Sequence, residues 1–206
     1  MRQRPHPLPL LSTALLALGL WAGVAKAQTT SFNWVSAFGG TAYDAAEAVA
    51  TDGSGNVCIC GEFSGMVNYG AYTLTSAGTS DGFVASYNSA GAVLWAKKIG
   101  GAINTCARSI AIAPDRSVYV AGYGLDSSIS YGSATTQTVN RIYVNKYDPA
   151  GHLLWSLRPR GRGEARATGL AVSRDGRFIY VVGTVTDTLS AGAFSLPAGL
   201  YRQALI

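Results

Sequence analysis

Two stretches of the chain, Tyr87-Asn-Ser-Ala-Gly-Ala-Val-Leu-Trp95 and Tyr147-Asp-Pro-Ala-Gly-His-Leu-Leu-Trp155, are near copies of each other. Each begins with tyrosine, passes through a tight turn with glycine, and ends in a short apolar segment that closes on tryptophan. The spacing is also kept, because Trp34, Trp95 and Trp155 are 61 and 60 residues apart. Such a period predicts a repeat protein whose units pack one on the next.

A second landmark lies elsewhere in the same period and supports it. Gly61, Gly122 and Gly183 recur every 61 residues. The segments that end on them are Val57-Cys-Ile-Cys-Gly61, Val118-Tyr-Val-Ala-Gly122 and Ile179-Tyr-Val-Val-Gly183. We assign these three glycines and the three tryptophans as the structural repeat positions. A further pair, Gly39-Gly40, recurs as Gly100-Gly101, and in the third repeat Gly161-Arg-Gly163 is expected to take its place.

The composition favours strands. Charged residues make up only 13% of the chain, whereas there are 25 glycines and 11 tyrosines, which suits short strands and tight turns. Four strands are predicted in the second repeat, at residues 109–113, 118–123, 142–147 and 153–157. The first of these is rich in small residues, like its equivalents 47–51 and 169–173, and is expected to be innermost. Hairpin turns are predicted at Asp52-Gly-Ser-Gly-Asn56 and Asp175-Gly176.

With these motifs in place, the repeat resembles the bacterial β-propeller repeat family known as SBBP. The matching residues are Gly100-Gly101, Val118 to Gly122, Tyr147-Asp148, Leu154-Trp155, and in the first repeat Phe83-Val84-Ala85 and Tyr87. The resemblance covers about residues 32 to 206. It implies an all-β fold, an incomplete β-propeller of roughly three four-stranded blades, each of about 60 residues. The family carries no shared catalytic residues, and its members resemble secreted or surface proteins.

The repeats divide the chain into five parts. We expect a signal peptide at 1–27, an outer strand of a closing blade at 28–40, blade 1 at 41–99, blade 2 at 100–160 and a partial blade 3 at 161–206. In this interpretation 32–38 is a lone outer strand, and the chain ends inside the third strand of its last blade. Further blades of the same protein are then the partners that close the ring, since about 4 to 8 blades are needed.

Charge and polar motifs argue against several function classes. Without the leader the chain carries 13 basic and 11 acidic residues, and no nucleic-acid-binding motif is present. Arg158, Arg160, Arg162 and Arg166 form one local cluster that could meet phosphate or an acidic glycan, or simply be a solvated loop. His152 is the one histidine after the leader and sits in a turn, which leaves no histidine-based metal cluster or catalytic triad.

Carboxylates and cysteines are assigned structural roles. Asp52, Asp115 and Asp175 precede the same strand in each repeat, which favours turn geometry over a calcium loop. Nothing in the sequence shows that Asp148, Glu164 and Asp187 converge as a glycosidase requires. Cys58 and Cys60 lie on one face of a strand and are expected to be small buried hydrophobes rather than half of a metal site, and the role of Cys106 is left open.

These observations predict a protein that is not an enzyme and that holds no cofactor or metal. We expect a secreted or cell-surface structural or binding module, which contacts a protein or glycan ligand on its loop face. The alternative is a piece of a secreted propeller enzyme whose active site lies elsewhere. Such an enzyme would be glycan-active or, because the segment ending at Trp155 is similar to the tryptophan-docking motif of PQQ-dependent dehydrogenases, a quinoprotein.

Export generates the first testable prediction. Arg2 and Arg4 precede an apolar run from Leu8 to Val24, and Ala25-Lys-Ala27 is a small-x-small cleavage site. The run is shorter than the about 20 residues that a spanning helix needs, so we expect cleavage and no remaining membrane span. Amino-terminal sequencing of the exported protein should find Gln28 as its first residue. A first residue of Met1 would contradict the predicted cleavage of the leader.

Overall fold

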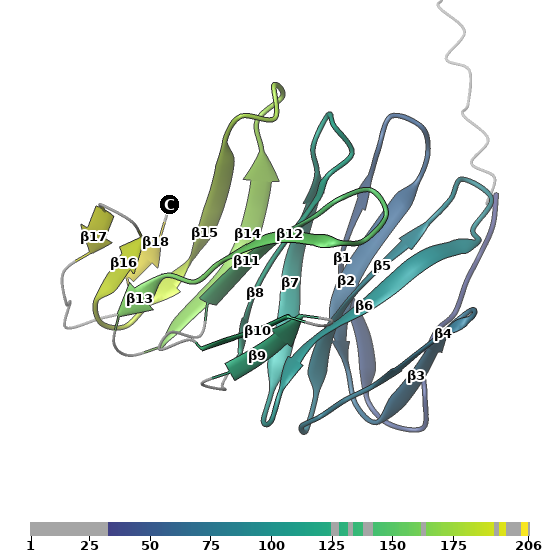
Figure 1. Ribbon diagram of the computed structural model, residues 1–206, viewed down its shortest axis with the longest axis horizontal. Coiled ribbons are helices and arrows are strands. Elements are labelled where there is room, and N and C mark those ends of the chain that lie inside the picture. The colour runs from purple at the N-terminus through teal and green to yellow at the C-terminus, as the bar shows by residue number, and fades with distance from the viewer. Residues whose placement is uncertain are drawn as a thin grey trace, which may run out of the picture. The chain divides into compact units, whose positions relative to one another are not determined.

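The computed structural model describes residues 33–124, 128–131, 134–137, 142–161, 164–191, 194–196 and 203–205, so the leader and its cleavage site lie outside the description. The chain separates into two units, Met1–Phe32 and Asn33–Ile206, and all that follows concerns the second. The described residues contain antiparallel strands and no helix, which confirms the all-β class (Figure 1). Within them no helix is long and apolar enough to cross a membrane.

The strands fall into three repeats. Repeat 1 consists of β1 (Asp44–Thr51), β2 (Val57–Phe63), β5 (Asp81–Tyr87) and β6 (Val93–Gly101), paired in that order. Repeat 2 has β7 (Thr105–Ile112), β8 (Val118–Gly124), β11 (Ile142–Tyr147) and β12 (Leu153–Leu157), also in order. Repeat 3 has β14 (Ala165–Val172), β15 (Ile179–Val185) and β18 (Gln203–Leu205). The four strands predicted in the second repeat are therefore present.

Each repeat also carries a hairpin that the sequence did not predict. The hairpins are β3–β4 (Met66–Tyr69 and Tyr72–Thr75), β9–β10 (Ser128–Tyr131 and Ala134–Gln137) and β16–β17 (Leu189–Ala191 and Phe194–Leu196). Each lies between the second and third strands of its repeat. The outer strand that precedes a repeat reaches this hairpin, because Gly39 pairs with Asn68, Gly100 with Ser130, and Arg160 of β13 (Arg160–Gly161) with Ser190.

This pairing corrects the assignment of the third glycine pair. Arg160 takes the position of Gly39 and Gly100, and Gly161 takes the position of Gly101. The expected motif Gly161-Arg-Gly163 was thus placed one residue too late. The physical reason is that the paired residue lies five positions after the repeat tryptophan in all three repeats. Strand pairing keeps this distance even where the residue at that position is not glycine.

The strands rich in small residues lie next to one another, as expected of innermost strands. β7 contacts both β1 and β14, so the first strands of the three repeats are neighbours (Figure 1). Each contains a β-bulge: between Ala46 and Ala48 in β1, between Ala107 and Ser109 in β7, and between Ala167 and Gly169 in β14. Alanine and glycine at these positions allow the strands to approach closely.

The bulges explain the repeated glycines. A Cβ atom on Gly61 would lie 1.9 Å from the carbonyl oxygen of Ala45 in the facing bulged strand. A Cβ on Gly122 or Gly183 would lie 2.1 Å from the carbonyl oxygen of Cys106 or Arg166, respectively. Real Cβ atoms do not approach an oxygen so closely, so the backbone excludes every side chain at this position of each repeat.

The repeated tryptophan connects one repeat to the next. The Trp95 indole lies over Gly151, whose φ of +83° is the left-handed conformation that suits glycine, and a Cβ there would be 2.6 Å from the ring. Trp95 Nε1 donates a hydrogen bond of 3.0 Å to the Pro149 carbonyl oxygen, and its ring centre is 6.1 Å from that of Tyr147. Trp34 packs in the same way on Gly91.

Three apolar clusters hold the repeats. The first joins repeats 1 and 2 and includes Cys60, Trp95, Ile110 and Tyr143; the second joins repeats 2 and 3 around Ala121 and Ala167. The third lies on the remaining side of repeat 1, where Phe38 stacks on Tyr69 with ring centres 4.8 Å apart. The core is therefore divided between the repeats rather than gathered in one centre.

The segment predicted as a lone outer strand, residues 32–38, is described only in part. Phe32 lies outside the described residues, and residues 33–38 do not form a strand, since only Gly39 makes a bridge. Strand geometry requires a hydrogen-bonding neighbour, and the described residues provide none for this segment. Its Trp34 packs on Gly91 and its Phe38 stacks on Tyr69, so these side chains make contacts typical of repeat residues.

The turn aspartates act as the sequence indicates. Asp52 Oδ1 accepts hydrogen bonds from the backbone N–H groups of Ser54 and Asn56, at 2.8 and 2.9 Å, so it closes the β1–β2 turn. The backbone N–H of Ser117 likewise holds the pKa of Asp115 below its usual value.

The tryptophans give a quantitative prediction. Trp95 is 4% exposed, whereas Trp155 is 39% exposed and contacts Tyr119 edge-on. Trp95→Ala should cost about 3–5 kcal/mol of unfolding free energy, and Trp155→Ala at least about 2 kcal/mol less. Urea unfolding of both variants checks this, and equal losses would contradict it.

Candidate functional site

The β-bulges place a set of polar side chains together. Glu47, Arg108 and Thr168 are the bulged residues of β1, β7 and β14. A bulged residue has no partner in the ladder, so its identity does not disturb strand pairing, and bulges often lie beside functional sites. Around them we define the bulge row, which consists of Glu47, Glu62, Arg108, Tyr123, Glu164 and Arg166.

Arg108 connects the first two repeats within this row. Its Nη1 atom is 2.6 Å from Oε2 of Glu47, and the two side chains are 34% and 22% exposed. Its Nη2 atom donates a hydrogen bond of 3.3 Å to the hydroxyl of Tyr123, and this bond, together with the charge of Glu47, raises the pKa of Arg108. The guanidinium is thus held in one position and remains partly open to solvent.

Arg166 brings the third repeat to the same tyrosine. Its guanidinium carbon is 4.9 Å from the ring centre of Tyr123, and that of Arg108 is 5.8 Å away. Arg166 also pairs with Glu164. Two cations near one aromatic ring, each neutralised by a carboxylate, give the bulge row both hydrogen-bonding groups and an aromatic surface.

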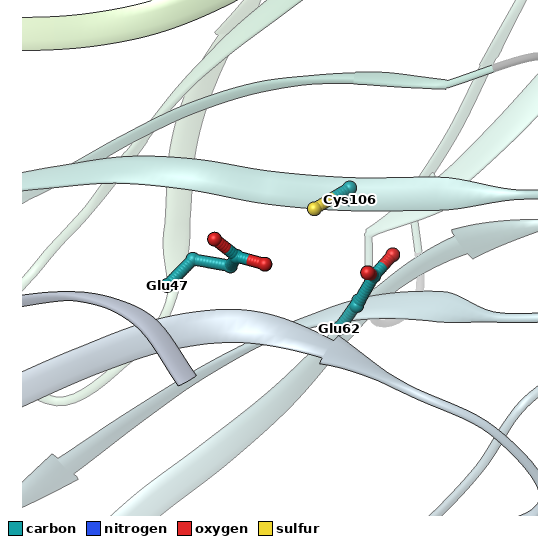
Figure 2. Close-up of side chains that lie close together, drawn as sticks. All are labelled: Glu47, Glu62 and Cys106. Atoms are coloured by element: carbon teal, nitrogen blue, oxygen red, sulfur yellow. The ribbon is translucent and has the colours of Figure 1, made fainter. Parts of the chain in front are cut away.

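Glu47 and Glu62 of the bulge row converge with Cys106, as Figure 2 shows. Their possible ligand atoms lie within 4.8 Å of one another. Cys106 is fully buried, and this burial, with a contribution from the charge of Glu62, raises the pKa of the thiol well above its usual value. Without a metal ion the sulfur therefore carries a proton at neutral pH, and binding of a metal ion there would have to release that proton.

The cluster has no need of a metal for charge balance at Glu47, because Arg108 already pairs with it. Glu47, Glu62 and Cys106 are the described side chains best placed to hold a cation. The other two cysteines are buried as predicted: Cys58 is 3% exposed and Cys60 is fully buried, both in the cluster between repeats 1 and 2.

The two arginines of the sequence cluster whose side chains the structure describes, Arg158 and Arg166, lie against different aromatic rings. The Arg158 guanidinium lies 4.6 Å from the ring centre of Tyr143, and burial lowers its pKa. Arg166 belongs to the bulge row. Arg162 and the side chain of Arg160 lie outside the described residues.

The carboxylates considered for catalysis stay apart. Asp148 pairs with His152 at 2.8 Å, Glu164 pairs with Arg166, and Asp187 accepts a hydrogen bond from the backbone of Thr188. The two carboxylates that do converge, Glu47 and Glu62, were missed. Their signals in the sequence are slight: Glu47 interrupts an alanine-rich strand, and Glu62 follows the landmark Gly61.

Comparison with known proteins supports a repeat architecture. No family model matches the chain. It is 32% identical over 127 residues to the regulatory protein FlaEY of Caulobacter vibrioides, which covers 59% of this chain and 13% of that protein. It is 27% identical over 154 residues to an uncharacterized WD repeat-containing protein of Acanthamoeba polyphaga mimivirus, which covers 66% of this chain and 11% of that protein. The chain therefore spans about a tenth of the length of these curated relatives.

Burial of the thiols gives a prediction for this region. Because burial raises the pKa of Cys60 to about 12, and raises that of Cys106 further, neither thiol should react with an aromatic disulfide reagent at pH 8 in the folded protein. Both should react at once in denaturant. Mass spectrometry of the labelled peptides checks this. Rapid labelling of Cys106 in the native protein would contradict the conclusion that its thiol is buried and protonated.

Proposed function

We propose that this chain belongs to an exported β-propeller of the SBBP type and works as a structural or binding module. The observation that supports this most is the repetition of one junction: a tryptophan on a glycine turn, and an outer strand reaching the hairpin of the next repeat. Such a junction restricts the motion of each repeat relative to the next, because the two repeats are in contact at two separate points. Rigid scaffolds of this kind usually bind through residues at one face.

The bulge row is our proposed binding surface, and a glycan is the proposed ligand. Its carboxylates and guanidinium groups can accept and donate hydrogen bonds to sugar hydroxyls, and Tyr123 supplies an aromatic group among them. The side chains of Arg108 and Arg166 are 34% and 38% exposed, so a ligand can reach them. Three repeats contribute to this surface, and their junctions fix its geometry.

The second candidate is a secreted glycan-active enzyme, and the convergence of Glu47 and Glu62 is the observation in its favour. Glycoside hydrolysis uses two carboxyl groups on either side of the scissile bond. In this structure the pairing of Glu47 with Arg108 holds one of them in an ion pair. We therefore propose binding rather than turnover.

A glycan array with the full chain tests the proposal, followed by titration of the best ligand. Tyr123→Ala and Arg108→Ala should each weaken binding by about tenfold or more, which corresponds to about 1.4 kcal/mol. Arg116→Ala is the matched control, because Arg116 is a basic residue of the β7–β8 turn outside the bulge row, and it should leave binding unchanged.

Two outcomes would overturn binding at this surface. Glycan binding that survives both bulge-row substitutions would place the ligand elsewhere. Hydrolysis of the bound glycan by the wild type, lost in Glu62→Gln, would support the enzymatic alternative instead.

A further inference from the structure

A cavity lies at the junction between repeats 1 and 2, and none of its lining residues belongs to the bulge row. Its volume is about 100 Å³, and it is partly open to solvent. The lining residues are Asp52, Asn56, Cys58, Ser86 and Leu94 of repeat 1 and Ile112, Arg116, Val118 and Pro149 of repeat 2. Because both repeats supply walls, the shape of the cavity depends on how the two repeats pack.

The cavity lies where repeat 1 has small side chains and repeat 2 has large ones. Cys58 of β2 is directly opposite Ser86 of β5. The equivalent cross-strand pair of repeat 2 is Tyr119 of β8 and Lys146 of β11. Cys58 and Ser86 are almost fully buried, at 3% and 4% exposure. The space at this junction therefore corresponds to a tyrosine ring that repeat 2 supplies from its own chain.

Tyr119 shows what this position of a repeat accommodates. It is 4% exposed, its ring lies edge-on to Trp155 with ring centres 5.8 Å apart, and Lys146 Nζ is 5.2 Å from its ring centre. The equivalent residue of repeat 3 is also a tyrosine, Tyr180. An apolar cavity of about 150 Å³ is known to bind benzene. A space of about 100 Å³ that is partly open to solvent can thus hold most of one six-membered ring.

The cation that lines the cavity stands at an unusual backbone position. Arg116 has a φ of +64°, whereas the residues with the same turn hydrogen bond in the other repeats are Gly55 and Gly176, with φ of +80° and +73°. The left-handed conformation disfavours a side chain, so glycine would fit this turn of repeat 2 with less strain. The Arg116 guanidinium makes no ion pair or hydrogen bond with a described residue, so it can donate to a ligand.

Asp52 supplies a hydrogen-bond acceptor beside this cation. Burial acts to raise the pKa of Asp52, but hydrogen bonds from Asn56 and Ser54 and the charge of Arg116 hold it below its usual value, so the carboxylate is ionised at neutral pH. Its Oδ2 atom accepts one hydrogen bond, of 2.7 Å from Asn56 Nδ2, and has capacity for another. A hydroxyl group both donates and accepts, so it can bind Asp52 and Arg116 together, whereas Asp52 would repel a carboxylate.

We propose that the cavity binds a single-ring phenol, with the ring in the space equivalent to that of Tyr119 and the hydroxyl group toward Asp52 and Arg116. Leu94 and Ile112 give the ring apolar contacts. The phenol can be a free small molecule or the side chain of a tyrosine in another polypeptide, because the ring and the hydroxyl group are the same. The proposal does not rest on the glycan surface, since the two sites share no residue.

Titration of the full chain with p-cresol, followed by ligand-observed NMR, is the first test. The dissociation constant should be on the order of 1 mM or lower. Toluene lacks the hydroxyl group and p-toluate is an anion, so each should bind at least about tenfold more weakly. Toluene or p-toluate binding as tightly as p-cresol would overturn the proposal, and so would the absence of p-cresol binding at about 10 mM.

Two substitutions connect binding to the cavity. Cys58→Tyr introduces the residue of the other repeats and should abolish p-cresol binding, because the new ring occupies the space. Arg116→Gly introduces the residue of the equivalent turns and should weaken p-cresol binding by about tenfold. Its thermal unfolding temperature should be unchanged or higher, since glycine accepts a positive φ. This second variant keeps the test decisive if Cys58→Tyr disturbs the packing of the repeats.

The matched control is Arg177→Gly, at an exposed arginine in the equivalent turn of repeat 3, and it should bind p-cresol like wild type. Tyr123→Ala alters the proposed glycan surface and should also leave p-cresol binding unchanged, so failure of one proposal is distinguishable from failure of the other. Affinity for p-cresol that survives both cavity substitutions would reject this site, as would an equal loss in Arg177→Gly.

N-acetyltyrosinamide distinguishes the two sources of the phenol. If it binds as tightly as p-cresol and competes with it, the cavity accepts the tyrosine side chain of a polypeptide. If p-cresol binds at least about tenfold more tightly, the site is specific for free phenols. In either case Arg116→Gly should weaken the interaction, and an affinity that this substitution leaves unchanged would reject the role of the hydroxyl group.

Discussion

The contact between an indole ring and a glycine turn is the constraint on which the rest of the structure depends. The Trp95 side chain projects from β6 over Gly151 in the next repeat, and its N–H donates a hydrogen bond to a carbonyl oxygen of the same turn. The ring fits because the glycine has no Cβ and accepts a positive φ. The apolar contact and the hydrogen bond together define both the distance and the rotation between two sheets.

Once this contact is set, the other features of the repeat follow. The first strands come so close together that their residues must be small, and the glycine opposite each bulge cannot carry a side chain. The outer strand is directed toward the next hairpin, where it adds a bridge or a short ladder. The apolar core is consequently distributed over the junctions, which couples the folding of each repeat to the presence of its neighbour.

The sequence predicted the features that recur at every junction, because each must satisfy the same geometry. Trp95 and Gly122 are visible as landmarks for that reason, and so are the strands around them. The hairpin β3–β4 was missed because its residues differ in each repeat and only its position is shared. The spacing of Trp95 and Trp155 gave their common phase in the repeat but not their exposed fractions, which are 4% and 39%.

The candidate site was harder to predict for a related reason. Bulged residues interrupt the alternation from which burial is usually inferred, so Glu47 and Arg108 gave no periodic signal. The loop arginines gave a visible cluster that the fold then divides, with Arg158 against Tyr143 and Arg166 against Tyr123. Charge proximity in the sequence is a poor guide where successive residues of a strand point to opposite faces.

The bulge has a further consequence for how such a protein can change over time. The three repeats place glutamate, arginine and threonine, Glu47, Arg108 and Thr168, at one equivalent site, while the paired residues on either side remain small. Substitution there leaves the ladder hydrogen bonds intact. Mutation can therefore vary the chemistry of the surface without disturbing strand pairing. Duplicated repeats can thus diverge in recognition first and in architecture last, because selection on the scaffold and selection on the surface act on different residues.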